Sequence, residues 1–182
     1  MSRRNAIVSA IALLVSMTSM PLAPNPARAQ APPPQAPAPA PAQTAPPPYG
    51  MPITLEAAKQ IMAAAEAEAE KNKWPVVIVI LDSGGNVVML HRRDDAQLGA
   101  ISTAEGKART ALQFKRPTKL LDEVISAGGG GLRYLALKDV VPLEGGMPIT
   151  IDGKIVGAIG VSGVLSTQDT QVARAGIDAV AK

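Results

Sequence analysis

His91 is the chain's one histidine, and cysteine is absent. A neutral imidazole is a good ligand for a metal or a haem iron, and a Ser–His catalytic pair would have to use His91. The lack of cysteine excludes thiolate metal sites, Cys–His pairs and disulfides. The plainer alternative is that His91 is a surface residue near the end of an edge strand.

A second set of residues has the chemistry to bind an anion. Its members are Lys107, Arg109, Glu144, Gly145, Gly146, Ser162 and Gly163. The two cations fall on one predicted helix, where the arginine could pair with a carboxylate or propionate in bidentate geometry. The turn at 144–146 could expose backbone N–H groups, and residues 162–163 precede a helix whose N-terminus attracts anions. Solubilising cations and ordinary turns explain the same residues, and the glycine spacing matches neither a dinucleotide-binding motif nor a P-loop.

Two acidic residues, Asp94 and Asp95, directly follow two arginines. A solvated loop with weak local ion pairs is the simplest interpretation. The two carboxylates could instead orient His91 or bind a cation. If the chain is an enzyme, Asp95, Glu144 and Lys107 are the candidates for acid–base chemistry.

Two hairpins must position these residues. Residues 76–81 are a continuous β-branched and leucine run, typical of a strand covered on both faces, and a turn at 82–86 leads to a second strand at 87–92. Alternation places His91 on the face opposite Leu90. Asp152-Gly153 joins a strand at 149–151 to one at 154–161. Glycines 157 and 160 in that last strand indicate close approach of a helix or a ligand.

Four helices accompany the strands. The predicted caps are Thr54 for a helix at 55–72, Ser102 with Glu105 for a helix ending near 114, Thr118 for a short helix through 125, and Ser166 with Asp169 for a last helix to about 181. Residues 55, 58, 61, 62 and 65 form the apolar face of the first helix. Residues 128–131 predict a mobile loop or hinge, 132–137 a helical turn and 141–143 a strand start. This order predicts an α+β fold, an antiparallel sheet with helices on its faces.

The N-terminal part of the chain has the features of an export signal followed by a spacer. Residues 1–29 combine Arg3 and Arg4, a 12-residue apolar run too short to span a bilayer comfortably, and a cleavage signal before Gln30. Residues 30–52 are rich in proline and alanine and predict a disordered tether. Residues 53–182 then form one folded domain. We expect a periplasmic or secreted protein without a stable membrane anchor; general and twin-arginine export both stay open.

The formal net charge of +3 comes from the predicted export signal. Three arginines are the charged residues of 1–29, and the rest of the chain holds 15 basic and 15 acidic residues. Four aromatic residues provide few rings for base stacking. A nucleic-acid partner is therefore not expected.

Several motifs resemble the GlcG/HbpS family. They are residues 76–86, Arg93-Asp94-Asp95-Ala96, Gly106-Lys107-Ala108-Arg109-Thr110-Ala111, Arg116-Pro117-Thr118, Pro142-Leu143-Glu144-Gly145-Gly146-Met147-Pro148, residues 155–163 and Gln168-Asp169. They cover nearly all of 53–181 in order. The resemblance implies a profilin-like, three-layer α/β/α fold, homo-oligomers, and pocket or fold roles for Lys107, Thr110 and residues 144–146.

Members of this family include a haem-binding protein that works with a sensor kinase, a protein encoded with glycolate oxidase, and the C-terminal half of a cobalamin adenosyltransferase. Haem-binding relatives can take an axial histidine from the first helix, but residues 55–72 contain none. His91 is then the imidazole available to an iron. The resemblance implies an exported haem- or tetrapyrrole-binding protein for binding, storage or sensing, with any haem degradation slow. The alternatives are a binding module for a small anionic metabolite such as a glycolate-like carboxylate, or an enzyme of unknown reaction.

Overall fold

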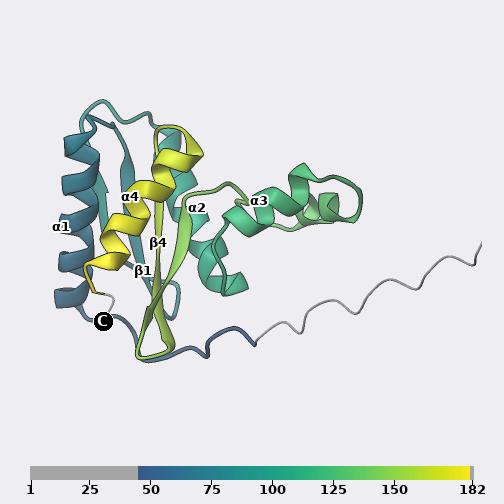
Figure 1. Cartoon of the computed structure of the whole chain (residues 1–182), viewed down its shortest axis with the longest axis horizontal. Coiled ribbons are helices and arrows are strands. Elements are labelled where there is room, and N and C mark those ends of the chain that lie inside the picture. The colour runs from purple at the N-terminus through teal and green to yellow at the C-terminus, as the bar shows by residue number, and fades with distance from the viewer. Residues whose placement is uncertain (1–44, 181–182) are drawn as a thin grey trace, which may run out of the picture. The chain divides into compact units, whose positions relative to one another are not determined.

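The computed structural model describes residues 45–180, so the predicted export signal and most of the predicted tether lie outside the described residues. Four strands form one antiparallel sheet in the order β2-β1-β4-β3 (Figure 1). They are β1 (Val77–Asp82), β2 (Val87–Arg92), β3 (Gly146–Ile151) and β4 (Lys154–Ser162). Both predicted hairpins are confirmed, and β1 and β4 occupy the centre as expected.

Helices cover both faces of the sheet. On one face, α1 (Leu55–Lys71) and α4 (Ser166–Asp178) pack against Ile78 and Ile80 of β1. On the other, α2 (Gly99–Phe114) packs against Val77 and Val79. Burying each such side chain contributes about 1.5–3 kcal/mol. The predicted α+β fold with three layers and a central antiparallel sheet is confirmed (Figure 1).

The glycines of β4 allow close packing of protein against protein. A Cβ on Gly160 would lie 2.0 Å from the carbonyl oxygen of Ala104, so a larger residue would push α2 off the sheet. A Cβ on Gly157 would lie 2.2 Å from the carbonyl oxygen of Leu81 in the neighbouring strand. Of the two alternatives for these glycines, approach by a helix is the one found at Gly160.

The predicted start of α1 is confirmed and that of α2 is wrong. Thr54 Oγ1 accepts a hydrogen bond from the N–H of Ala57 at 3.2 Å, although Leu55, expected on the apolar face, is 53% exposed. α2 already begins at Gly99, and Ser102 Oγ donates to the Gly99 carbonyl. The expected Ser102–Glu105 capping box therefore lies inside the helix.

Two further predicted helix caps are wrong, because Thr118 and Asp169 have hydrogen-bond partners elsewhere in the protein. Thr118 precedes α3 (Lys119–Ser126), but its Oγ1 accepts the N–H of Gly146 at 2.9 Å. The residue before α4 is Leu165, whose N–H donates to Oε1 of Gln168 at 3.2 Å. Ser166 is thus the first helical residue, and Asp169 points into the protein.

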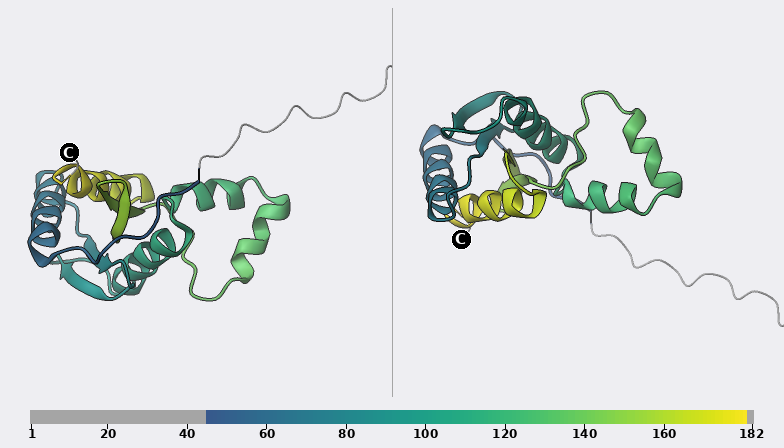
Figure 2. Two further views of the ribbon diagram at one scale, coloured as in Figure 1. Left: turned by 90° about the horizontal axis from the view of Figure 1, so that it is seen from below. Right: turned by 90° about the horizontal axis from the view of Figure 1, so that it is seen from above.

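Residues 119–136 form an arm, made of α3 and the 3₁₀ helix η1 (Gly129–Ala136), that extends beyond one end of the layers (Figures 1 and 2). Three of the four glycines predicted as a loop belong to η1, which also includes most of the expected helical turn. Residues 141–143 form no strand. The arm's exposed apolar side chains are Leu120, Val124, Leu132 and Leu135.

The last residues of the predicted tether belong to the folded domain. β1 pairs with β4 as far as Gly157, and residues 48–50 take the next place along β4. The N–H of Ile155 donates to the Pro48 carbonyl at 2.9 Å, and the N–H of Gly50 donates to the Ile155 carbonyl at 2.8 Å. Residues 48–50, which belong to the predicted tether, therefore lie against β4. Between residues 45 and 180, no helix combines the length and apolar character needed to cross a membrane.

Candidate functional site

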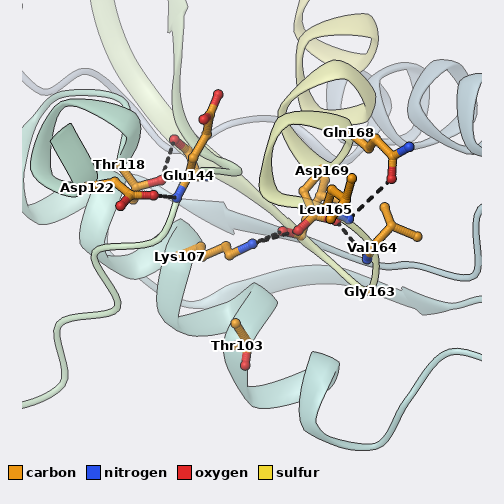
Figure 3. A network of polar contacts seen from close by, with 12 residues as sticks. Thr103, Lys107, Thr118, Asp122, Glu144, Gly163, Val164, Leu165, Gln168 and Asp169 are labelled. Atoms are coloured by element: carbon orange, nitrogen blue, oxygen red, sulfur yellow. Dashed lines mark hydrogen bonds and ion pairs between the residues drawn. The ribbon is translucent and has the colours of Figure 1, made fainter. Parts of the chain in front are cut away.

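Lys107 lies inside the protein, where α2 passes the end of β4 (Figure 3). Its side chain is 2% exposed, as is that of Asp169 on α4. Lys107 Nζ donates to Asp169 Oδ2 at 2.8 Å and to the Val161 carbonyl at 3.0 Å. A buried ammonium needs such partners, because leaving water costs it several kcal/mol.

The glycine turn before β3 wraps around this lysine. Gly145 has a φ of +125°, and a Cβ there would lie 2.9 Å from Lys107 Nζ. A Cβ on Gly146 would lie 2.3 Å from the Lys107 carbonyl oxygen. Two N–H groups of the turn already have protein acceptors: Gly146 donates to Thr118 Oγ1, and Glu144 donates to Asp122 Oδ2 at 3.2 Å.

Asp169 occupies the place where the sequence indicated an anion. Its Oδ1 accepts the N–H of Val164 at 3.3 Å, just after Ser162 and Gly163 (Figure 3). Burial raises the pKa of Asp169 above its ordinary value of 3.8, against the lowering effects of Lys107 and of the Val164 N–H. The protein's own carboxylate thus fills this anion position.

The other predicted anion-site residues lie apart from Lys107 or face inward. Arg109 donates to the Gly85 carbonyl at 3.0 Å and to Glu105 Oε1 at 2.7 Å, so it lies against the β1–β2 turn. Thr110 is buried, and its Oγ1 accepts the N–H of Val141 at 2.9 Å.

The side chain of Glu144 pairs with Lys119 at 3.4 Å and raises the pKa of that lysine. Of the acid–base candidates, Lys107 is buried beside the turn that carries Glu144, while Asp95 lines a separate cavity.

His91 faces α1 from the edge strand β2. It lies opposite Ile78 in the β1–β2 register, which places it on the α1 side of the sheet. Leu90 pairs with Val79 on the other side, so the predicted opposite placing of His91 and Leu90 is confirmed. Its Nδ1 lies 2.8 Å from Glu66 Oε1, and its side chain is 43% exposed. A carboxylate accepts but does not donate, so Nδ1 carries the proton and the neutral ring keeps Nε2 as its acceptor.

A cavity of about 520 Å³ adjoins this pair where α1 ends. Its lining includes Glu66, Glu70, Trp74, Arg92 and Arg93. Arg93 and Glu70 form an ion pair parallel to that of His91 and Glu66. Glu66 and Trp74 were not among the predicted site residues. The signal for the two ion pairs lies in the spacing: four residues along a helix and two residues along a strand both span about 6 Å, so Glu66 and Glu70 can face His91 and Arg93.

Comparison with known proteins connects this geometry to a family. The family model described as "Haem degrading protein HbpS-like" matches residues 53–178. Protein GlcG of Escherichia coli K12 is 39% identical over 110 residues, which cover 60% of this chain and 81% of that protein.

Two solved structures have the same fold. A crystal structure of HbpS matches with a TM-score of 0.67 and 32% identity, covering 73% of this chain and 93% of the other. A PduOC:heme complex matches with a TM-score of 0.66 and 31% identity, covering 71% and 96%. These matches confirm the resemblance found in the sequence. The chain belongs to the HbpS-like family, the family described as haem-degrading proteins.

Proposed function

We propose that this chain is an exported haem-binding protein that binds, stores or senses haem, with His91 as an axial ligand. The family description and the haem complex of a relative support haem as the ligand. A sensor-kinase partner belongs to the sensing role and stays a prediction.

The observation that carries the proposal is the hydrogen bond between His91 and Glu66. Histidines that bind metals commonly donate their second ring N–H to a carboxylate, which fixes the tautomer and raises the basicity of the ligating nitrogen. The 2.8 Å contact from Nδ1 to Glu66 Oε1 provides this arrangement. The side chain of His91 is also 43% exposed rather than enclosed in the core. The residues present therefore fit haem, whose iron would supply the axial position that an imidazole fills.

Titration of the purified protein with ferric haem tests this proposal. We expect a shifted Soret band for the wild type, and its loss or a much weaker affinity for His91→Ala. Leu90→Ala is the matched control, because Leu90 is the neighbouring residue on the opposite face of β2. A flat wild-type titration at micromolar haem would contradict haem binding. An unchanged titration of His91→Ala would contradict only the role of His91 as the iron ligand and would leave haem binding itself in place.

The lysine and arginine of the competing anion-binding hypothesis both have partners within the protein. Lys107 contacts Asp169 and the Val161 carbonyl, and Arg109 contacts Glu105 and the Gly85 carbonyl. An anion at either residue would have to replace a bond already made. We therefore favour haem over a small carboxylate.

Export is proposed from residues 1–29, which carry the arginines, apolar run and cleavage signal described above. We expect the mature protein in the periplasm or medium to begin at Gln30. N-terminal sequencing of the protein recovered from that fraction measures this directly. A protein that stays in the cytoplasm with its first residues intact would contradict export.

A homo-oligomer is proposed on the basis of the arm. Leu132 and Leu135 are 51% and 63% exposed on η1, and a second copy of the chain would bury such side chains. Light scattering should give a multiple of the monomer mass that Leu135→Glu reduces. Leu98→Glu changes a comparably exposed leucine at the start of α2 and should have no effect. A monomeric wild type would contradict assembly.

A further inference from the structure

The strand β4 is longer than its neighbour β1, so its first residues need another partner. β4 begins at Lys154, but its pairing with β1 stops at Gly157, which lies opposite Asp82. The chain turns away at Asp82, whose Oδ1 accepts the N–H of Gly84 at 2.8 Å, and continues into β2. On this side, residues 154–156 would present unpaired backbone donors and acceptors, the groups through which a sheet edge binds another strand.

Residues 48–53, which we call the strap, fill this place. In addition to the two hydrogen bonds with Ile155 described above, the N–H of Ile53 donates to the Val156 carbonyl at 2.9 Å. Ile53 is 7% exposed and belongs to the core on the α1 side of the sheet. Pro48 has no N–H, so the pairing cannot continue beyond it. One end of the strap is therefore fixed in the core, and the other end needs an attachment of its own.

Tyr49 attaches this other end to α2. Its Oη donates to the carbonyl of Leu112, in the last turn of the helix, at 2.8 Å. The Nζ of Lys115 lies 4.2 Å from the centre of the tyrosine ring, in a cation–π contact. The next residue is Gly50, where a Cβ would lie 2.9 Å from the Cβ of Lys154. A larger residue at this position would therefore push the strap away from β4.

We propose that the start of β4 is an edge that accepts an extended strand, and that the chain closes this edge with its own strap, held by Tyr49. Releasing the strap frees the N–H and carbonyl of Ile155 and the carbonyl of Val156, which fit the backbone of an added strand. In a solution of the pure protein, that strand comes from a second copy of the chain. Residues 48–52 precede the range that the family model matches, so the attachment through Tyr49 is not part of what that model describes.

Hydrogen exchange in the whole chain tests the attachment at a single amide. Tyr49→Ala should speed exchange at the N–H of Ile155, which is bonded to the Pro48 carbonyl, about ten-fold. Tyr49→Phe keeps the ring but loses the hydrogen bond to Leu112, so its effect should be smaller. The N–H of Val161, near the other end of β4, should keep its wild-type exchange rate, because it is bonded to the turn before β3.

Met51→Ala is the matched control, since Met51 belongs to the strap but its side chain is 83% exposed. It should change neither exchange rate. Haem titration should give the wild-type result for every strap variant. The reason is that His91 pairs with Ile78 near the start of β1, whereas the strap lies past the end of β1.

Light scattering tests whether the released edge binds a second copy. Gly50→Val displaces the strap, so its mass should rise with protein concentration, and the mass of Met51→Ala should not. Both changes are made in the Leu135→Glu background, so that assembly through the arm does not contribute.

Thermal unfolding of every variant checks the fold, and Tyr49→Ala replaces Gly50→Val in light scattering if Gly50→Val does not fold. An unchanged exchange rate at Ile155 in Tyr49→Ala would overturn the attachment. Equal acceleration at Ile155 and Val161 would also overturn it, because Tyr49 would then support the whole fold. Acceleration confined to Ile155 without concentration-dependent association would overturn the strand-accepting edge. Each of these results leaves the proposed haem function standing.

Discussion

Lys107 on α2 and Asp169 on α4 form an ion pair of 2.8 Å between side chains that are each 2% exposed. The two helices cover opposite faces of the sheet. The pair therefore joins the outer layers at the end of β4, beneath the 144–146 turn (Figure 3). Lys107 thus has a structural partner at the position where the sequence indicated a ligand.

Replacing Lys107 alone should strongly destabilise the fold. Lys107→Met leaves the Asp169 carboxylate buried without its partner, a change that costs about 3–5 kcal/mol. The double variant Lys107→Met/Asp169→Leu should recover most of this loss, because neither charge remains. Urea unfolding measures these differences. Lys119→Met, which breaks the exposed contact with Glu144, should change little, and equal effects of Lys107→Met and Lys119→Met would contradict the buried role.

The stability contributed by Asp169 should fall as the pH rises. Burial raises the pKa of Asp169 in the folded chain, so the folded state holds this proton more tightly than the unfolded state. Its contribution is greatest below the unfolded pKa of about 4 and declines up to the raised folded pKa. Urea unfolding across this pH window should show the decline in wild type and not in Asp169→Asn. A wild-type advantage that grows with pH would show instead that Lys107 dominates.

Gly145 should tolerate no side chain. In Gly145→Ala the new Cβ would meet the Val161 carbonyl at 2.8 Å and Lys107 Nζ at 2.9 Å, in a backbone conformation with a φ of +125°. We expect a loss of about 2–4 kcal/mol. Gly153→Ala is the control, since Gly153 has a φ of +72° but an open surrounding, and should cost about 1 kcal/mol. Equal losses in thermal unfolding would mean that the close packing is unimportant.

Lys73→Gly should stabilise the protein. Lys73 adopts a φ of +56° at the Schellman turn after α1, a conformation that glycine adopts without strain. The expected gain is about 0.5–1 kcal/mol, seen as a higher Tm. Lys71→Gly, inside α1, should lower the Tm, because glycine is unfavourable in a helix. A lower Tm for Lys73→Gly would mean that Lys73 makes contacts that outweigh the backbone strain.

The sheet could be predicted from the sequence because its signals are local. The 76–81 run and the Asp152-Gly153 turn each specify a strand or a hairpin within a few residues. Helix caps proved less predictable. Thr118 has the residue type of a cap, but its hydroxyl bonds to Gly146, which lies 28 residues away. A three-residue pattern cannot reveal such a competing partner.

The candidate site shows the same limit. Lys107 was correctly placed on a helix, but its partner Asp169 is 62 residues away and was interpreted as a helix cap. His91 was correctly placed on the face of β2 opposite Leu90, while Glu66, 25 residues away, was not among the residues singled out on the first helix. Pairing these residues requires the packing of α1 on β2, which periodicity alone does not specify.

The most direct test of the central claim is chemical rescue of the iron ligand. Wild-type protein with ferric haem should give the spectrum of an imidazole-ligated iron. His91→Gly should lose that spectrum, and free imidazole should restore it. A His91→Gly protein whose haem spectrum equals that of the wild type before imidazole is added would contradict ligation by His91.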